Sequence, residues 1–150
     1  MRWKPNVTVA AIIEKDGRFL MVEENAGGQR VINQPAGHLE KDESLLAAVK
    51  REVLEETAWE FEAEKVTGIY LYPSPGNDTT YLRICFSGKG IHHHPSLALD
   101  DGIIQALWMT RSELENKAPR LRSPLVLQCI DDHLAGKQYP LDIMHYIDQK

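Results

Sequence analysis

Three glutamates in one stretch of the chain have the spacing of metal ligands. Glu52, Glu55 and Glu56 stand at positions i, i+3 and i+4, so a helix would bring all three carboxylates to one face. Like charges at this distance repel, and each raises the pKa of the others unless a cation lies among them. Oxygen ligands without Cys or His favour Mg²⁺ or Mn²⁺ over Zn²⁺. The spacing therefore indicates a divalent metal site, and a simple solvated acidic face is the alternative.

The helix that would carry these glutamates is amphipathic. Leu45, Val49 and Val53 form an apolar stripe beside the acidic face, at helical spacing. We predict a helix over residues 44–57, with Asp42 or Ser44 as its N-terminal cap. The carboxylates would then border the buried side of the helix.

This stretch resembles the Nudix box, the signature G-x5-E-x7-R-E-U-x-E-E-x-G-U of the Nudix hydrolase superfamily, where U is apolar. The matching residues are Gly37, Glu43, Arg51, Glu52, Val53, Glu55, Glu56 and Trp59. Ala58 departs from the pattern, since the family has glycine there. Glycine forms a left-handed helix cap freely, whereas alanine in that conformation costs about 1 kcal/mol. We expect either a strained cap or another exit from the helix, with the metal ligands unaffected.

The resemblance implies a role for each matching residue in the hydrolysis of phosphoanhydride bonds. The implied ligands of a catalytic Mg²⁺, for which Mn²⁺ can substitute, are Glu52, Glu55, Glu56 and the backbone carbonyl of Gly37. Glu52 is the first choice for the proton acceptor. Glu43 and Arg51 would lock the loop to the helix and aim the ligands, and an ordinary surface salt bridge is the alternative for this pair.

Outside the box, two acidic residues lie where members of the superfamily often add a ligand, in the loop before a late strand. They are Asp100 and Asp101, but the commonest acidic position, six before Trp108, is Gly102 here. The sequence leaves an additional ligand from this loop open.

The run His92-His93-His94 lies in a segment that we predict to be a long loop, residues 88–102. Three adjacent histidines cannot all face one ion from an extended loop. We therefore favour a solvated loop over a zinc site.

Two arginines and a tyrosine are candidates for substrate binding. Arg83 lies within a predicted strand and Arg122 at the start of a predicted helix, and either could hold a phosphate. A structural ion pair is the alternative for both. Tyr81, like Trp3 and Trp108, could stack on a ring, although core packing explains Trp108 equally well.

The remaining pattern predicts a single α/β domain over residues 1–150. The predicted strands are 5–14, 18–24, 30–33, 64–72, 79–87 and 103–110. A short helix is expected from residue 112 and a long one over 121–135, capped by Ser123. This pattern indicates helices on both faces of a sheet. The resemblance implies the Nudix fold itself, a mixed sheet sandwiched between helices.

Composition restricts the partners. The net charge is −5 without a basic tract, which argues against binding to duplex nucleic acid. No apolar run is long enough to span a membrane. Cys85 and Cys129 lie in apolar segments and form no disulfide framework, as expected for a cytoplasmic protein. We expect a small phosphorylated substrate and a monomer or homodimer.

The resemblance narrows to one branch. The segments KPNVTVAAII, INQPAGHLE, YLRICF and LRSPLVLQCIDDHLAGKQYPLD are similar to the NudJ phosphatase branch. This similarity implies release of phosphate from nucleoside di- and triphosphates, thiamine diphosphate or hydroxymethylpyrimidine diphosphate. The alternative is an ADP-ribose-type pyrophosphatase, weakly favoured by a proline beyond the box, Pro75. A non-catalytic nucleotide sensor fits poorly, because such domains lose box carboxylates that this chain retains.

Overall fold

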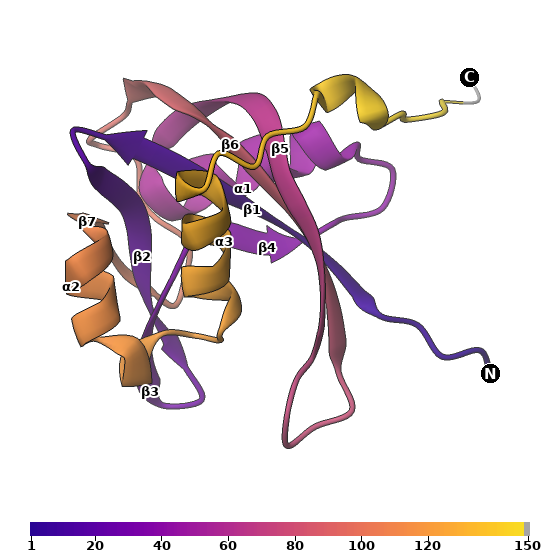
Figure 1. The fold of residues 1–150 in the computed structure, drawn as a ribbon, viewed down its shortest axis with the longest axis horizontal. Coiled ribbons are helices and arrows are strands. Elements are labelled where there is room, and N and C mark those ends of the chain that lie inside the picture. The colour runs from indigo at the N-terminus through magenta and orange to yellow at the C-terminus, as the bar shows by residue number, and fades with distance from the viewer. Residues whose placement is uncertain (149–150) are drawn as a thin grey trace.

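The computed structural model describes residues 1–148, so the last two positions of the predicted domain lie outside it. Its centre is a mixed, 7-stranded sheet with the order β3-β2-β1-β6-β5, in which β4 also pairs with β1 and β7 with β2 (Figure 1). Only the β1–β6 pair is parallel among the strands of the described chain. The strands are β1 (Asn6–Lys15), β2 (Arg18–Ala26), β3 (Gln29–Asn33), β4 (Ala36–His38), β5 (Trp59–Pro73), β6 (Thr80–His93) and β7 (Ile103–Met109).

Helices cover both faces of the sheet. They are α1 (Leu45–Thr57), α2 (Arg111–Asn116) and α3 (Leu125–Leu134), with short 3-10 turns at η1 (Ala118–Arg120) and η2 (Leu141–Ile143). In Figure 1, α1 lies behind the sheet and α3 in front of it. Within residues 1–148, every helix is too short or too polar to cross a membrane. The predicted mixed sheet between helices is confirmed.

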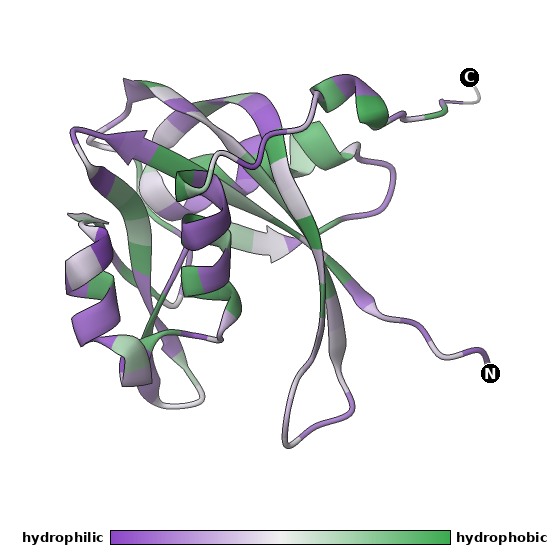
Figure 2. Ribbon diagram, viewed as in Figure 1, coloured by the Kyte–Doolittle hydropathy of each residue, from purple (hydrophilic) through white to green (hydrophobic). Residues whose placement is uncertain are grey.

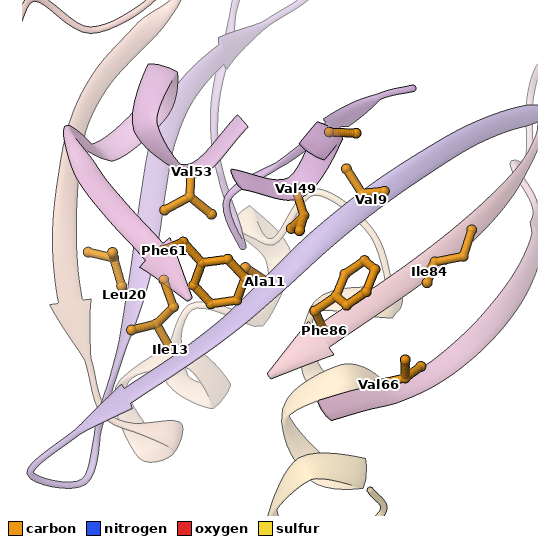
Figure 3. Close-up of a cluster of buried hydrophobic side chains, with 11 residues drawn as sticks. Val9, Ala11, Ile13, Leu20, Val49, Val53, Phe61, Val66, Ile84 and Phe86 are labelled. Atoms are coloured by element: carbon orange, nitrogen blue, oxygen red, sulfur yellow. The ribbon is translucent and has the colours of Figure 1, made fainter. Parts of the chain in front are cut away.

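Alternation along β1 divides the core between the two faces. Ala11 and its neighbours at even spacing pack with Val49 and Val53 of α1, in the cluster drawn in Figure 3. Ala10 and Ile12 point the other way, into a second cluster that includes residues of α3. β1 is accordingly apolar along its middle and polar at its ends (Figure 2). The strand is therefore buried on both sides and fixes the position of α1 against the sheet.

The cap residues of α1 resolve two expectations. Ser44, rather than Asp42, is the N-terminal cap, because its side chain accepts a hydrogen bond from the Ala47 N–H at 3.1 Å. At the other end, Ala58 adopts the left-handed conformation, with φ 62° and ψ 19°, and its N–H donates to the Leu54 carbonyl. The chain thus retains the strained cap at the position where the family has glycine.

Three predicted boundaries were wrong. β5 begins at Trp59, five residues before the prediction, and β6 continues to His93, so residues 88–93 of the predicted loop 88–102 are strand. Pairing with β5 holds the weak strand formers at the end of β6 in an extended conformation. Gly88 lets the backbones of β5 and β6 approach closely, because a Cβ at this position would lie 2.1 Å from the Glu62 carbonyl oxygen. α3 begins at Leu125, because Arg122 donates its N–H to the Ile32 carbonyl and so stays outside the helix.

Candidate active site

Arg51 joins the acidic residues of the box. Its guanidinium donates two hydrogen bonds to the Glu43 carboxylate, at 2.9 and 2.7 Å, and one each to Glu52 and Glu55 at 2.7 Å. Its side chain is 24% exposed and that of Glu43 is 16% exposed, so this is no ordinary surface pair. The hydrogen bonds with Glu43 hold the pKa of Arg51 above its usual value. The predicted Glu43–Arg51 contact is confirmed, while the contacts to Glu52 and Glu55 were not predicted, although Glu55 has the i+4 spacing that could have indicated one.

Two of the three glutamates are buried with incomplete charge compensation. One Glu56 oxygen accepts the Ala36 N–H at 2.9 Å, yet burial and the nearby Glu52 raise the pKa of Glu56 to about 9. Burial also raises the pKa of Glu52, against the opposing effect of Arg51. Glu55 is more exposed and bonds to Arg51. The buried carboxylates therefore retain a demand for positive charge that a divalent cation would meet.

Gly37 provides the space in which the Glu52 carboxylate lies. A Cβ at position 37 would stand 2.2 Å from Glu52 Cδ, closer than real side-chain contacts allow. Gly37 pairs with Val9 of β1, so the central strand sets its position. The family requirement for glycine here thus has a local cause, which is room for a carboxylate beside the Gly37 backbone. This set of carboxylate and carbonyl oxygens suits Mg²⁺ or Mn²⁺.

A cleft of about 610 Å³ opens beside these groups. Glu52, Glu56 and Gly37 form part of its wall, whereas Glu55 does not. The three residues predicted to bind substrate all line the same cleft, and they are Arg83, Arg122 and Tyr81. The structure therefore brings together acidic and basic groups that are separated by as many as 98 positions, the span from Glu24 to Arg122.

The two arginines differ in their partners. Arg83 is 5% exposed and donates to the side-chain oxygens of Gln34 at 2.9 Å and Asn33 at 3.3 Å, and to Cys129 Sγ at 3.9 Å. None of these hydrogen-bond partners is a carboxylate, and the Arg83 Nε lacks any partner within the described chain. The Gln34 amide is fixed by donating to the Val126 carbonyl at 2.7 Å, so its oxygen faces Arg83. Arg122 is 44% exposed and is paired with Glu24. The structural ion pair considered for both arginines is thus present only for Arg122.

Tyr72 was missed in the sequence and lies opposite Tyr81 on neighbouring strands, with both side chains lining the cleft. Only the register between β5 and β6 shows that Tyr72 faces the cleft, and the sequence alone does not determine that register. Trp108 packs at the edge of the Trp59 ring and belongs to the α1-side core, while Trp3 is exposed, so neither lies in the cleft. Two aromatic rings on one wall suit a planar substrate ring.

The loop before β7 approaches the box helix. The Asp100 N–H donates to the Glu55 carbonyl at 3.0 Å, and the charge of Asp100 contributes to the raised pKa values of Glu52 and Glu56. Burial raises the pKa of Asp100, and the nearby charges of Glu55 and Asp101 raise it further. Asp100 is therefore the better placed of the two candidates for an additional ligand.

Comparisons with known proteins identify the family of this chain. The profile of the NUDIX domain family matches residues 2–128. Phosphatase NudJ of Escherichia coli K12 is 37% identical over 142 residues, which is 95% of this chain and 92% of that protein. A NUDIX hydrolase from Nitrosomonas europaea superposes with a TM-score of 0.96 at 51% identity, covering 98% of this chain and 100% of that one. A MutT NUDIX hydrolase from Burkholderia pseudomallei shares the fold, with a TM-score of 0.73 at 19% identity over 87% of this chain and 98% of its own. This chain, with its mixed sheet between helices and its intact acidic box, belongs to the Nudix hydrolase family.

Proposed function

We propose that this Nudix hydrolase is a metal-dependent phosphatase that releases orthophosphate from nucleoside di- and triphosphates or from thiamine and hydroxymethylpyrimidine diphosphates. The observation that carries the proposal is one cleft lined by two buried carboxylates and by Arg83, a buried cation that makes no hydrogen bond to a carboxylate within residues 1–148. A relative that is 37% identical bears the name Phosphatase NudJ, which supports terminal phosphate release. We assign the activity to one domain over residues 1–150.

The metal would be held by the box residues. Glu52, Glu55, Glu56 and the Gly37 carbonyl offer the oxygen ligands, with Mg²⁺ as the expected ion and Mn²⁺ as a substitute. Such an ion neutralises phosphate charge and stabilises the leaving oxygen when bound. Arg51 and Glu43 would orient these ligands through the hydrogen bonds described above.

Side chains of the protein would accept the proton and bind the substrate. Glu52 would accept a proton from the attacking water, because its carboxylate lies at the cleft wall beside Gly37. The water oxygen forms the new bond to phosphorus as the anhydride P–O bond breaks, and the departing phosphate ester keeps the bridging oxygen. Arg83 would hold phosphate oxygens in the cleft, and Tyr72 and Tyr81 would contact the organic part of the substrate.

An ADP-ribose-type pyrophosphatase is the second candidate. Ser74 and Asn77, which flank Pro75 in the β5–β6 loop, line the cleft, so this loop is in place to contact a larger substrate. The two functions differ in their products. The phosphatase releases orthophosphate from a terminal phosphate, whereas the pyrophosphatase splits ADP-ribose into AMP and ribose phosphate.

A product panel distinguishes them. We expect the purified enzyme with Mg²⁺ to release orthophosphate from thiamine diphosphate and from nucleoside diphosphates, and to lose this activity with EDTA. AMP and ribose phosphate from ADP-ribose, with no orthophosphate from thiamine diphosphate, would instead establish the second candidate.

The role of Arg83 can be measured separately. Charge-assisted hydrogen bonds contribute roughly 1.5–3 kcal/mol, so Arg83→Gln is expected to raise KM about 10- to 100-fold. Arg122→Gln is the matched control and should have a smaller effect, because Arg122 is more exposed and already paired with Glu24. Equal KM values for Arg83→Gln and the unmodified enzyme would contradict the assigned role.

A further inference from the structure

A second cluster of possible metal ligands lies on the β5–β6 ribbon, outside the cleft. Glu60 of β5 pairs in register with His92 of β6, and His94 follows two positions later. One ligand atom from each of these three residues lies within 4.8 Å of the other two. His94 Nε2 is 2.8 Å from Glu60 Oε2, and the rings of His92 and His94 meet edge to face with centroids 4.4 Å apart.

The sequence disfavoured such a site because residues 88–102 were predicted to be a loop, whereas β6 extends to His93. In an extended strand, side chains alternate between faces, so His92 and His94 share one face. His93 points the other way and stacks on Trp59, with ring centroids 4.9 Å apart. Two histidines, rather than three, therefore meet, and the neighbouring strand supplies a carboxylate as the third ligand.

We propose that Glu60, His92 and His94 bind a transition-metal ion of the zinc type, at a site separate from the catalytic cluster. Two imidazole nitrogens and a carboxylate oxygen form a donor set that suits Zn²⁺, Co²⁺ or Ni²⁺, whereas the oxygen-only box suits Mg²⁺ or Mn²⁺. None of the three residues lines the cleft. The two sites therefore differ both in position and in the ion they prefer.

The geometry requires only a small rearrangement. Tetrahedral ligands at about 2.1 Å from an ion lie about 3.4 Å from each other. The Glu60–His94 pair would open by roughly half an ångström from its present hydrogen bond, and the other distances would close from within 4.8 Å. His92 is exposed, so a fourth position is open to water. Lys50 also acts on Glu60 from outside the cluster, and its positive charge opposes the binding of a cation there.

The site would tie together three elements. The His94 N–H donates to the carbonyl of Ala58, the left-handed cap of α1, at 2.8 Å, and Glu60 lies two residues beyond that cap. An ion shared by Glu60, His92 and His94 would therefore fix the end of β6 to the junction of α1 and β5. Because an ion that binds only the folded chain stabilises it, Zn²⁺ should raise Tm without being needed for turnover.

Cobalt absorption tests the proposal on the full chain without an affinity tag. The protein is titrated with Co²⁺ in excess Mg²⁺, which occupies the catalytic cluster, and Zn²⁺ is then added as competitor. We expect visible Co²⁺ absorption at one ion per chain, displaced by Zn²⁺. His92→Gln and His94→Gln should each weaken binding about tenfold or more, since each removes a ligand, whereas His93→Gln, on the opposite face, should not.

Two results would overturn the proposal. One is the absence of Co²⁺ absorption in the unmodified protein. The other is equal binding by the His92→Gln, His94→Gln and His93→Gln proteins, which would place the ion elsewhere. Phosphate release in Mg²⁺ should be unchanged in all three variants, so the outcome does not depend on the proposed function.

Discussion

Replacing Gly37 by alanine should disable the active site while leaving the fold intact. The new Cβ would stand 2.2–2.3 Å from the three terminal atoms of Glu52, and ordinary contact begins at 3.4 Å. The Glu52 carboxylate must therefore move by about 1 Å, and a misplacement of that size in a reacting group costs roughly 100-fold in rate. The backbone has no reason to change, because Gly37 is not among the glycines with positive φ. The carbonyl offered to the metal also remains.

The assay is steady-state release of orthophosphate in Mg²⁺, together with thermal unfolding. We expect kcat of Gly37→Ala to fall about 100-fold with little change in Tm. Gly68→Ala is the matched control, since it adds a Cβ 2.9 Å from the Tyr70 hydroxyl, outside the cleft and also at a glycine without positive φ. This variant should remain active. If Gly37→Ala turned over within about threefold of the unmodified enzyme, the assigned position of Glu52 in catalysis would be refuted.

Three further predictions concern the box helix. Glu55→Gln and Glu56→Gln should each lower kcat by about 100-fold or more while the circular dichroism spectrum is retained, because each removes a charge offered to the metal; near-normal turnover in both would contradict the assignment. Glu56 has a folded pKa of about 9 against an ordinary 4.5, so its contribution to stability is present at low pH and is lost as pH rises toward 9. In EDTA, denaturant titration between pH 4.5 and 9 should therefore show Glu56→Gln gaining stability relative to the unmodified protein as pH rises. A difference in stability that stays constant with pH would argue against the raised pKa. Ala58→Gly should increase the free energy of unfolding by about 1 kcal/mol, because it relieves the φ of 62° at the cap, and a loss of stability would show that the cap is not strained.

Local signals predicted the elements that carry the acidic residues. The apolar stripe of α1, its Ser44 cap and the buried strand β1 depend on neighbouring residues, so the sequence was sufficient. The end of β6 was missed because Gly88, Gly90 and the histidines favour loops on their own, and the start of β5 was missed with it because the two segments pair. These residues of β6 form a strand only through pairing with β5, which is a non-local interaction.

The composition of the site was predictable, but the state of its charges was not. The motif identified the glutamates and Arg51, and the chemistry of arginine suggested Arg83 and Arg122. Which arginine is free of a carboxylate depends on contacts with residues 49 to 98 positions away, namely Gln34, Asn33 and Glu24. Such contacts leave no trace in local spacing.

The most direct test of the central claim is anomalous scattering from a crystal soaked with Mn²⁺ and a non-hydrolysable diphosphate. The account predicts a manganese peak at ligand distance from carboxylates of Glu52, Glu55 and Glu56, with a phosphate of the analogue between that peak and Arg83. Manganese density elsewhere, with none beside these three glutamates, would contradict it.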